Sequence, residues 1–132
     1  MDEFENGINR IKKYFEDLEE YKGKKLEGKK DFYAASMIVF SILNDMLRVT
    51  EFFIARESFA APATYKEMMD ILAHKKIISQ TLANKMKLLV SGRNMISHEY
   101  GEIKASDVES MITQMQTVKE FIALLSRKYN KS

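Results

Sequence analysis

Apolar residues recur at intervals of three and four along most of this chain, with charged residues between them. This spacing places the apolar side chains on one face of an α-helix. It predicts five helices, which run from Asp2 to before Tyr21, from Asp31 to about Phe53, from Tyr65 to about Ala73, from about Ser79 towards Gly101, and from Ser106 to about Lys128. No segment alternates with a period of two. We therefore expect an all-α fold, an up-and-down four-helix bundle with one additional short helix.

Residues that commonly cap helices mark where these elements begin. Asp31 is the expected N-cap of the long second helix, and either Ser79 or Thr81 is expected to cap the fourth. Two segments have the form of a capping box, in which two side chains satisfy free backbone amides: Thr64-Tyr65-Lys66-Glu67 and Ser106-Asp107-Val108-Glu109. The apolar stripe that follows the second box predicts one continuous last helix.

Length and composition favour a single domain over residues 1–132. The chain is 45% hydrophobic, which is enough for a core without disulfides. It has no cysteine, so thiolate metal sites and thiol nucleophiles are excluded, and its histidines are His74 and His98. We therefore expect no metal site and no cofactor. The net charge of +2 neither requires nor excludes an anionic partner, so any nucleic-acid site must be local.

The longest apolar stretch, residues 32–54, raises the question of a membrane span. Polar and charged residues interrupt it at Asn44, Asp45, Arg48 and Glu51. We therefore expect a buried helix and no membrane association. The acidic, helical N-terminus is unlike a secretory signal, which makes the cytoplasm the expected location. Because buried polar groups need partners, Asn44, Asp45 and Arg48 are expected either to support a cleft or dimer seam or to form a satisfied structural pair.

The strongest candidate for chemistry lies near the end of the fourth helix, in the run Arg93-Asn94-Met95-Ile96-Ser97-His98-Glu99-Tyr100. Arginine keeps its charge at any cellular pH, and histidine is the side chain that ordinarily titrates near neutrality. The pair therefore suits proton transfer beside a phosphate. On an ideal helix, Arg93 and His98 diverge by about 140°. Either the helix loosens after Ser97, or these groups meet their counterparts across the twofold axis of a homodimer.

The need for two proton-transferring groups favours the homodimer. Metal-free RNA cleavage needs one group that deprotonates the 2′-hydroxyl, another that protonates the leaving 5′-oxygen, and cations that stabilise the charge on phosphorus. One chain offers one suitable histidine, whereas a homodimer offers two. Asn94 is expected to position the phosphate or His98. Each residue of the run also has a structural alternative: charge pairing at the helix end, a surface amide or, for Tyr100, a ring that seals the bundle.

The motif resembles the signature of HEPN domains, and in particular of HepT-like toxins. The matching positions are Arg93, Asn94, His98 and Tyr100, without an insertion. The similarity extends to flanking residues, which are Pro62, Tyr65, Ile71, Leu72, Leu82, Gly92, Glu99 and Gly101. The resemblance implies a small all-α ribonuclease that acts as a homodimer, with Arg93 and His98 of two subunits facing one cleft. It also implies a partner, a minimal nucleotidyltransferase antitoxin that can attach AMP to Tyr100.

Three hypotheses follow for the function. The leading one is a metal-independent endoribonuclease toxin of a HEPN–nucleotidyltransferase pair. In it, His98 acts as acid or base, Arg93 stabilises the transition state, and Asn94 positions the phosphate. The alternative is a non-catalytic subunit that binds nucleotide or substrate for a nucleotidyltransferase. The third is a structural helical adaptor without phosphate chemistry.

Overall fold

The computed structural model describes residues 2–98 and 102–131 of the protein, and most of these residues are helical. The elements are α1 (Glu3–Leu18), the 3₁₀ turn η1 (Glu19–Tyr21), α2 (Lys29–Arg56), α3 (Tyr65–His74), α4 (Gln80–His98), α5 (Ala105–Thr113) and α6 (Met115–Lys131). No strand occurs within the described residues. The all-α fold class predicted from the apolar spacing is confirmed.

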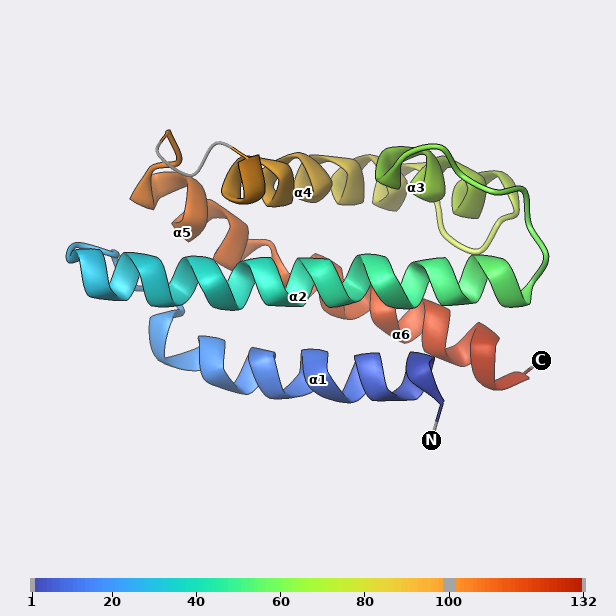
Figure 1. The fold of residues 1–132 in the computed structure, drawn as a ribbon, viewed down its shortest axis with the longest axis horizontal. Helices are drawn as coiled ribbons and strands as arrows, with labels where there is room; N and C mark the ends of the chain where they lie inside the picture. Colours follow the sequence, from blue (N-terminus) through green and yellow to red (C-terminus); the bar gives the residue numbers. More distant parts are fainter. Residues whose placement is uncertain (1, 99–101, 132) are drawn as a thin grey trace.

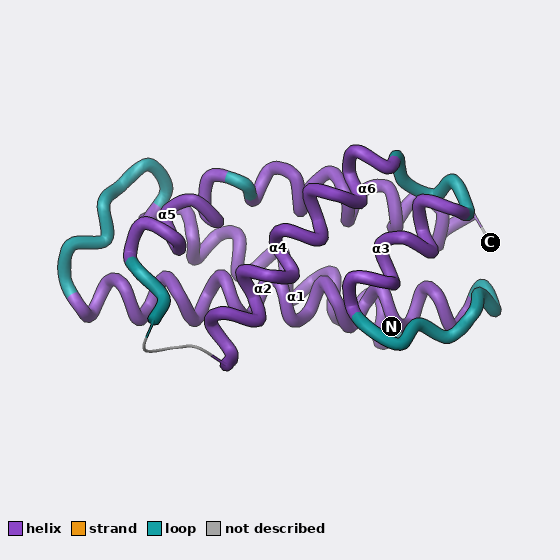
Figure 2. The backbone as a smooth tube through the Cα atoms, turned by 90° about the horizontal axis from the view of Figure 1, so that it is seen from above, coloured by secondary structure: helices purple, strands orange, loops and turns teal. Residues whose placement is uncertain are grey.

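The long helices alternate in direction around a central α2. Figure 1 shows α1 along one side of α2 and α4 along the other, with α6 crossing behind. The short helix α3 packs beside the first turns of α4. Figure 2 shows from above how the helices run side by side along the length of the bundle. The C-terminal end of α4 therefore points away from α3, towards the end of the bundle where α2 begins.

The core takes apolar side chains from all six α-helices. α2 buries residues on more than one face, among them Leu43, Met46 and Phe53, because the other helices pack around it. Burial of a large apolar side chain of this kind contributes roughly 1.5–3 kcal/mol to folding. Among residues 2–98 and 102–131, no helix has the length and apolar character that a membrane crossing requires.

The starts of α3 and α4 follow the predicted caps, whereas the start of α2 does not. Thr64 Oγ1 accepts a hydrogen bond from the Glu67 N–H at 3.1 Å, and Ser79 Oγ accepts one from the Leu82 N–H at 3.0 Å. The prediction of Asp31 as an N-cap is wrong, because α2 begins at Lys29 with Gly28 in the cap position. Asp31 lies instead in the first turn, where its negative charge is favourable near the positive end of the helix dipole.

The prediction of one continuous last helix from Ser106 is also wrong, because the helix breaks at Gln114. Just before the break, the Thr113 hydroxyl donates to the Ser110 carbonyl at 2.7 Å, a local bond that competes with the helical ladder. α5 starts at Ala105, one residue before the predicted capping box, and Asp107 rather than a serine–glutamate pair satisfies the free amide there. Glu109 makes a tertiary contact instead.

That contact fixes the loop between α1 and α2. The Glu109 carboxylate accepts a hydrogen bond from the Leu26 N–H at 2.7 Å. Leu26 is itself buried in the core, although its neighbours on both sides are exposed. A glutamate that looks like part of a local cap in the sequence therefore joins two distant segments.

The two ends of the described chain are held together by Tyr129. Its hydroxyl donates to the Asp2 carboxylate at 2.5 Å, and the guanidinium of Arg56 lies 3.8 Å from the centre of its ring. The hydrogen bond from Tyr129 lowers the pKa of Asp2, and the same bond raises the pKa of Tyr129. The first helix, the last helix and the end of α2 therefore meet at one aromatic side chain.

We expect replacement of two helical glycines by alanine to change the stability of the protein by different amounts. A Cβ at Gly7 would collide with Cγ1 of Val49, a stiff β-branched side chain in α2. A Cβ at Gly92 would lie 2.5 Å from Sδ of Met111, which is flexible and can move. We expect Gly7→Ala to lower the free energy of unfolding by about 1–3 kcal/mol. Gly92→Ala should change it by less than about 1 kcal/mol, because alanine also favours the helix.

Urea denaturation of both variants measures this difference. Gly92→Ala is the matched control, since it makes the same substitution inside another helix. A Gly7→Ala protein as stable as the wild type, or a larger loss for Gly92→Ala, would show that α1 and α2 can separate to accept the methyl group.

Candidate functional site

Arg93 joins α2 to α4 through its guanidinium. Its Nη2 donates to Oδ1 of Asn44 on α2 at 3.0 Å, and its Nη1 donates to Oδ1 of Asn94 at 3.1 Å. Both acceptors are neutral amides, so they orient the guanidinium without cancelling its charge. The sequence-predicted residues Arg93, Asn94 and Asn44 are thus brought together in one cluster.

Two aromatic rings complete the surroundings of Arg93. The centres of the rings of Phe40 on α2 and Tyr65 on α3 each lie 5.3 Å from its Cζ atom. An arginine at this distance from a ring is attracted to the negative face of the π-system. The position of the guanidinium therefore depends on three helices, α2, α3 and α4.

Arg93 keeps unused hydrogen-bonding capacity. Its Nε–H is buried and has no hydrogen-bond partner among the described residues. Arg93 takes no part in the ion pairs that Arg10 forms with Asp45 and Lys87 forms with Asp70. Leaving a buried donor unpaired costs about 1–3 kcal/mol, and more for a charged group. Arg93 as a whole is only partly buried, and its Nη1 and Nη2 atoms each keep a second N–H beyond the bond they make, so this fixed cation is suited to bind an anion such as a phosphate.

His98 ends α4 and is exposed to solvent. α4 is helical through His98, so the loosening after Ser97 that would turn it towards Arg93 does not occur. The two side chains therefore leave the helix about 140° apart. The second possibility, a meeting with groups from another copy of the chain, remains. Tyr100 lies outside the described residues, and its role in AMP attachment stays a prediction.

Asp45 and Arg48 of α2 differ in burial and in contacts. Asp45 is 7% exposed and accepts two hydrogen bonds from Arg10 of α1, at 3.2 Å from Nε and 3.3 Å from Nη2. Its carboxylate thus joins α1 to α2 and does not contact the Arg93 cluster. Arg48 is exposed and lies one turn after Asn44, on the same side of α2. Arg48 therefore adds a second positive charge to the side of α2 on which Asn44 binds Arg93.

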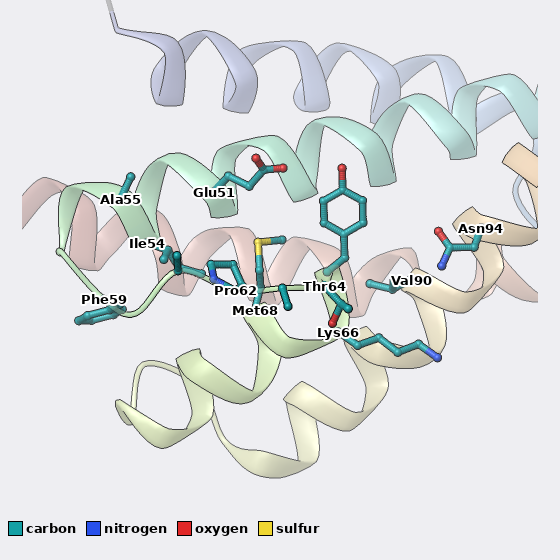
Figure 3. A pocket seen from close by; sticks show the side chains of 13 residues that line it. Glu51, Ile54, Ala55, Phe59, Pro62, Thr64, Lys66, Met68, Val90 and Asn94 are labelled. Carbon is teal, nitrogen blue, oxygen red and sulfur yellow. The ribbon is translucent and has the colours of Figure 1, made fainter.

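A pocket of about 860 Å³ adjoins the Arg93 cluster. It lies between α2, the 57–64 connection, α3 and α4 (Figure 3). Asn94 and Tyr65 belong to both the pocket and the cluster. Most of its wall is apolar, with Glu51 and Lys66 among the few charged groups. Within the described ranges, no group of three or more His, Cys, Asp or Glu side chains is placed to hold a metal ion.

Residues 4–125 match the family model described as Ribonuclease HepT-like. The chain belongs to this family. The resemblance carried by the motif at residues 93–100 is therefore confirmed over most of the sequence. The comparison with curated proteins gave no match.

Several solved structures share the fold of this HepT-like protein. One is a tri-AMPylated HEPN toxin from Shewanella oneidensis in complex with MNT antitoxin, with a TM-score of 0.86 and 17% identity over 96% of this chain and 98% of that one. A toxin–antitoxin structure with AMP-PNP gives 0.85 and 16% over 95% and 98%. YutE from Bacillus subtilis, a cytosolic protein of unknown function, gives 0.84 and 16% over 96% and 87%.

The sequence did not reveal every part of the candidate site. Phe40 and Tyr65 were missed as partners of Arg93, and so was the pocket. For Phe40 a signal existed, because it precedes Asn44 by four residues and so lies on the same side of α2. Tyr65 reaches the cluster only through the packing of α3 on α4, which no local pattern predicts.

The Arg10–Asp45 pair generates a prediction about stability. Arg10→Met should lower the free energy of unfolding by about 1–2 kcal/mol, because it leaves the buried carboxylate without a partner. This figure allows for the Arg10 side chain, which is 43% exposed and partly screened by water. Adding Asp45→Asn to Arg10→Met should recover part of the loss. Urea denaturation of the two single variants and the double variant measures the coupling, and purely additive effects would contradict it.

Proposed function

We propose that this HepT-like protein is a metal-independent endoribonuclease toxin that cleaves RNA in a composite cleft of a homodimer. The Arg93 cluster is the observation that supports the proposal most. It holds a cation between neutral amides and aromatic rings, and each Nη atom keeps a second N–H for a phosphate. The HepT-like ribonuclease family assignment agrees with this chemistry.

The proposed reaction uses groups from two copies of the chain. His98 of one copy removes the proton from a 2′-hydroxyl, whose oxygen attacks the adjacent phosphorus. His98 of the second copy donates a proton to the leaving 5′-oxygen. Arg93 stabilises the negative charge that builds on the phosphate oxygens, and Asn94 positions the group. The products are a 2′,3′-cyclic phosphate and a free 5′-hydroxyl.

The exposed side of α2 supports a dimer seam beside Arg93. Tyr33 and Met37 are 46% and 52% exposed, so this part of α2 presents apolar surface to the solvent. Helical spacing places them in one stripe with Asn44 and Arg48. A second copy that covers this stripe would bury apolar area next to the cations and bring its own Arg93 and His98 to the same cleft.

We also propose that the protein has a minimal nucleotidyltransferase as its antitoxin and works in the cytoplasm. The solved HEPN toxin and MNT antitoxin complex of the same fold supports the partner. AMP attached to Tyr100 would add a bulky anion two residues from His98. Such an anion would repel an RNA phosphate and fill part of the cleft.

A non-catalytic subunit that binds nucleotide for a nucleotidyltransferase is the second candidate. The pocket beside Arg93 favours it, since an apolar cavity next to a fixed cation suits a nucleoside phosphate. The two candidates differ in their need for His98, which only the nuclease uses as an acid or base.

RNA cleavage with EDTA present tests the nuclease. We expect His98→Ala and Arg93→Ala to lower the cleavage rate by at least about 100-fold, because each removes a group that acts in the transition state. His74→Ala is the matched control, since His74 is the other histidine and lies exposed at the end of α3. Gel analysis of labelled RNA measures the rates. A wild-type protein that does not cleave RNA, or a His98→Ala protein that cleaves at the same rate, would contradict the nuclease.

Asn44→Asp tests whether the charge of Arg93 is available to RNA. The new carboxylate would sit about 3.0 Å from Nη2 of Arg93 and form a charge-assisted hydrogen bond. In a His98→Ala background, we expect RNA affinity to fall by about tenfold, and the slope of log affinity against log salt to shrink by about 0.7, as for one lost phosphate contact. The melting temperature should not fall, because the cation gains a partner.

The control for this variant is Asn84→Asp. Asn84 is exposed on α4, nine residues before Arg93 and therefore on the opposite side of the helix. Fluorescence anisotropy at several salt concentrations measures both variants. Equal losses for Asn44→Asp and Asn84→Asp would mean that only the net charge of the protein matters.

A further inference from the structure

We propose that the pocket beside Arg93 binds one nucleobase of the RNA, and that Glu51 selects bases that carry an amino group. This inference rests on the nuclease function proposed above and specifies which nucleotide the site prefers. It is carried by the pocket's position, its wall and the single carboxylate that lines it.

The pocket is continuous with the place where a phosphate would bind. Asn94 lines the pocket and accepts a hydrogen bond from Arg93 at 3.1 Å. Tyr65 also lines it, and the centre of its ring lies 5.3 Å from the Arg93 guanidinium carbon. A nucleotide whose phosphate binds Arg93 therefore has its base within reach of the pocket mouth.

One stripe of α2 serves both places. Phe40 and Asn44 contact Arg93, and Glu51 and Ala55 line the pocket. These residues are separated by four, seven and four positions, which keeps them on one side of the helix. The register of α2 therefore sets the distance between the phosphate site and the pocket.

The shape and wall of the pocket suit a flat heterocycle. Its volume of about 860 Å³ is within the range of ligand pockets. Small or rigid residues, among them Ala55, Ala61 and Pro62, leave the space open, and Tyr65 offers an aromatic ring at the side nearest Arg93. Stacking on an aromatic side chain stabilises a bound base by about 1–3 kcal/mol.

Glu51 gives the pocket its preference. It is exposed on α2, and its side chain makes no hydrogen bond or ion pair with another described residue, so its carboxylate is open to a ligand (Figure 3). A carboxylate only accepts hydrogen bonds, so it pairs well with the amino groups of adenine, cytosine and guanine. Uracil offers it only the N3–H, which lies between two carbonyl oxygens that the carboxylate repels. Its negative charge also argues that this part of the site holds a base and not a phosphate.

Binding measurements on the full-length His98→Ala protein test the inference separately from cleavage. The probes are four short RNAs that differ in one base, measured by fluorescence anisotropy. We expect the uracil RNA to bind about tenfold more weakly than the best of the others, as for the loss of one good base contact. Glu51→Gln should remove this difference, because an amide both donates and accepts. Glu16→Gln, the same change on an exposed residue of α1, should preserve it.

Filling the pocket provides a second variant. Ala55→Trp should weaken the binding of all four RNAs. If Ala55→Trp lowers the melting temperature, Ala61→Trp replaces it, because a ring at residue 61 fills the pocket from the loop. Both residues are exposed, so the ring can enter the pocket without disturbing the core.

If these tryptophan variants change the oligomeric state of the protein and leave its base preference unchanged, the inference is overturned, because a second copy of the chain would then occupy the pocket.

Cleavage by the otherwise wild-type protein separates the two proposals. Cleavage next to amino-bearing bases that spreads to uracil in Glu51→Gln supports both. Cleavage with the same base preference in Glu51→Gln and Ala55→Trp overturns the pocket and leaves the nuclease standing. Base-selective binding without any cleavage supports the pocket as a base site and overturns the nuclease. The absence of both binding and cleavage overturns both.

Discussion

The candidate site depends on the contacts that hold the guanidinium of Arg93 in place. This guanidinium donates to no carboxylate among the described residues and is oriented instead by Asn44, Asn94 and two rings. A carboxylate would hold the cation more strongly, but it would also neutralise it. The arrangement gives up some stability, visible in the buried and unpaired Nε–H, and retains a positive charge in a fixed place.

α2 is the frame that makes this arrangement possible. Its apolar residues cover more than one face, so the other helices pack around it. Asp45 and Asn44 are neighbours in sequence, yet one binds α1 and the other binds Arg93 on α4. A helix turns by about 100° per residue, so adjacent polar residues serve different interfaces. The same rotation keeps Glu51 and Ala55 on the side of Asn44, where the pocket lies.

The regularity of α4 connects the proposed activity to assembly. Because α4 remains helical through His98, Arg93 and His98 of one chain diverge. The nuclease proposed here therefore needs a second copy to place an imidazole opposite a guanidinium. Its activity would depend on the formation of the homodimer. The proposed modification at Tyr100 would lie two residues from His98 in the sequence, so it would link the control of the activity to the same segment.

The sequence by itself determined the helical class and most helix limits, because helical spacing and caps depend on neighbouring residues. It also carried the HepT-like motif and pointed to Arg93, Asn94 and Asn44 as candidates. Tertiary structure alone decided the break at Gln114, the contact of Glu109 with Leu26, the meeting of Phe40 and Tyr65 at Arg93, and the pocket. These features arise where residues far apart in the chain pack together. Local periodicity says which face of a helix is apolar, but not which partner covers it.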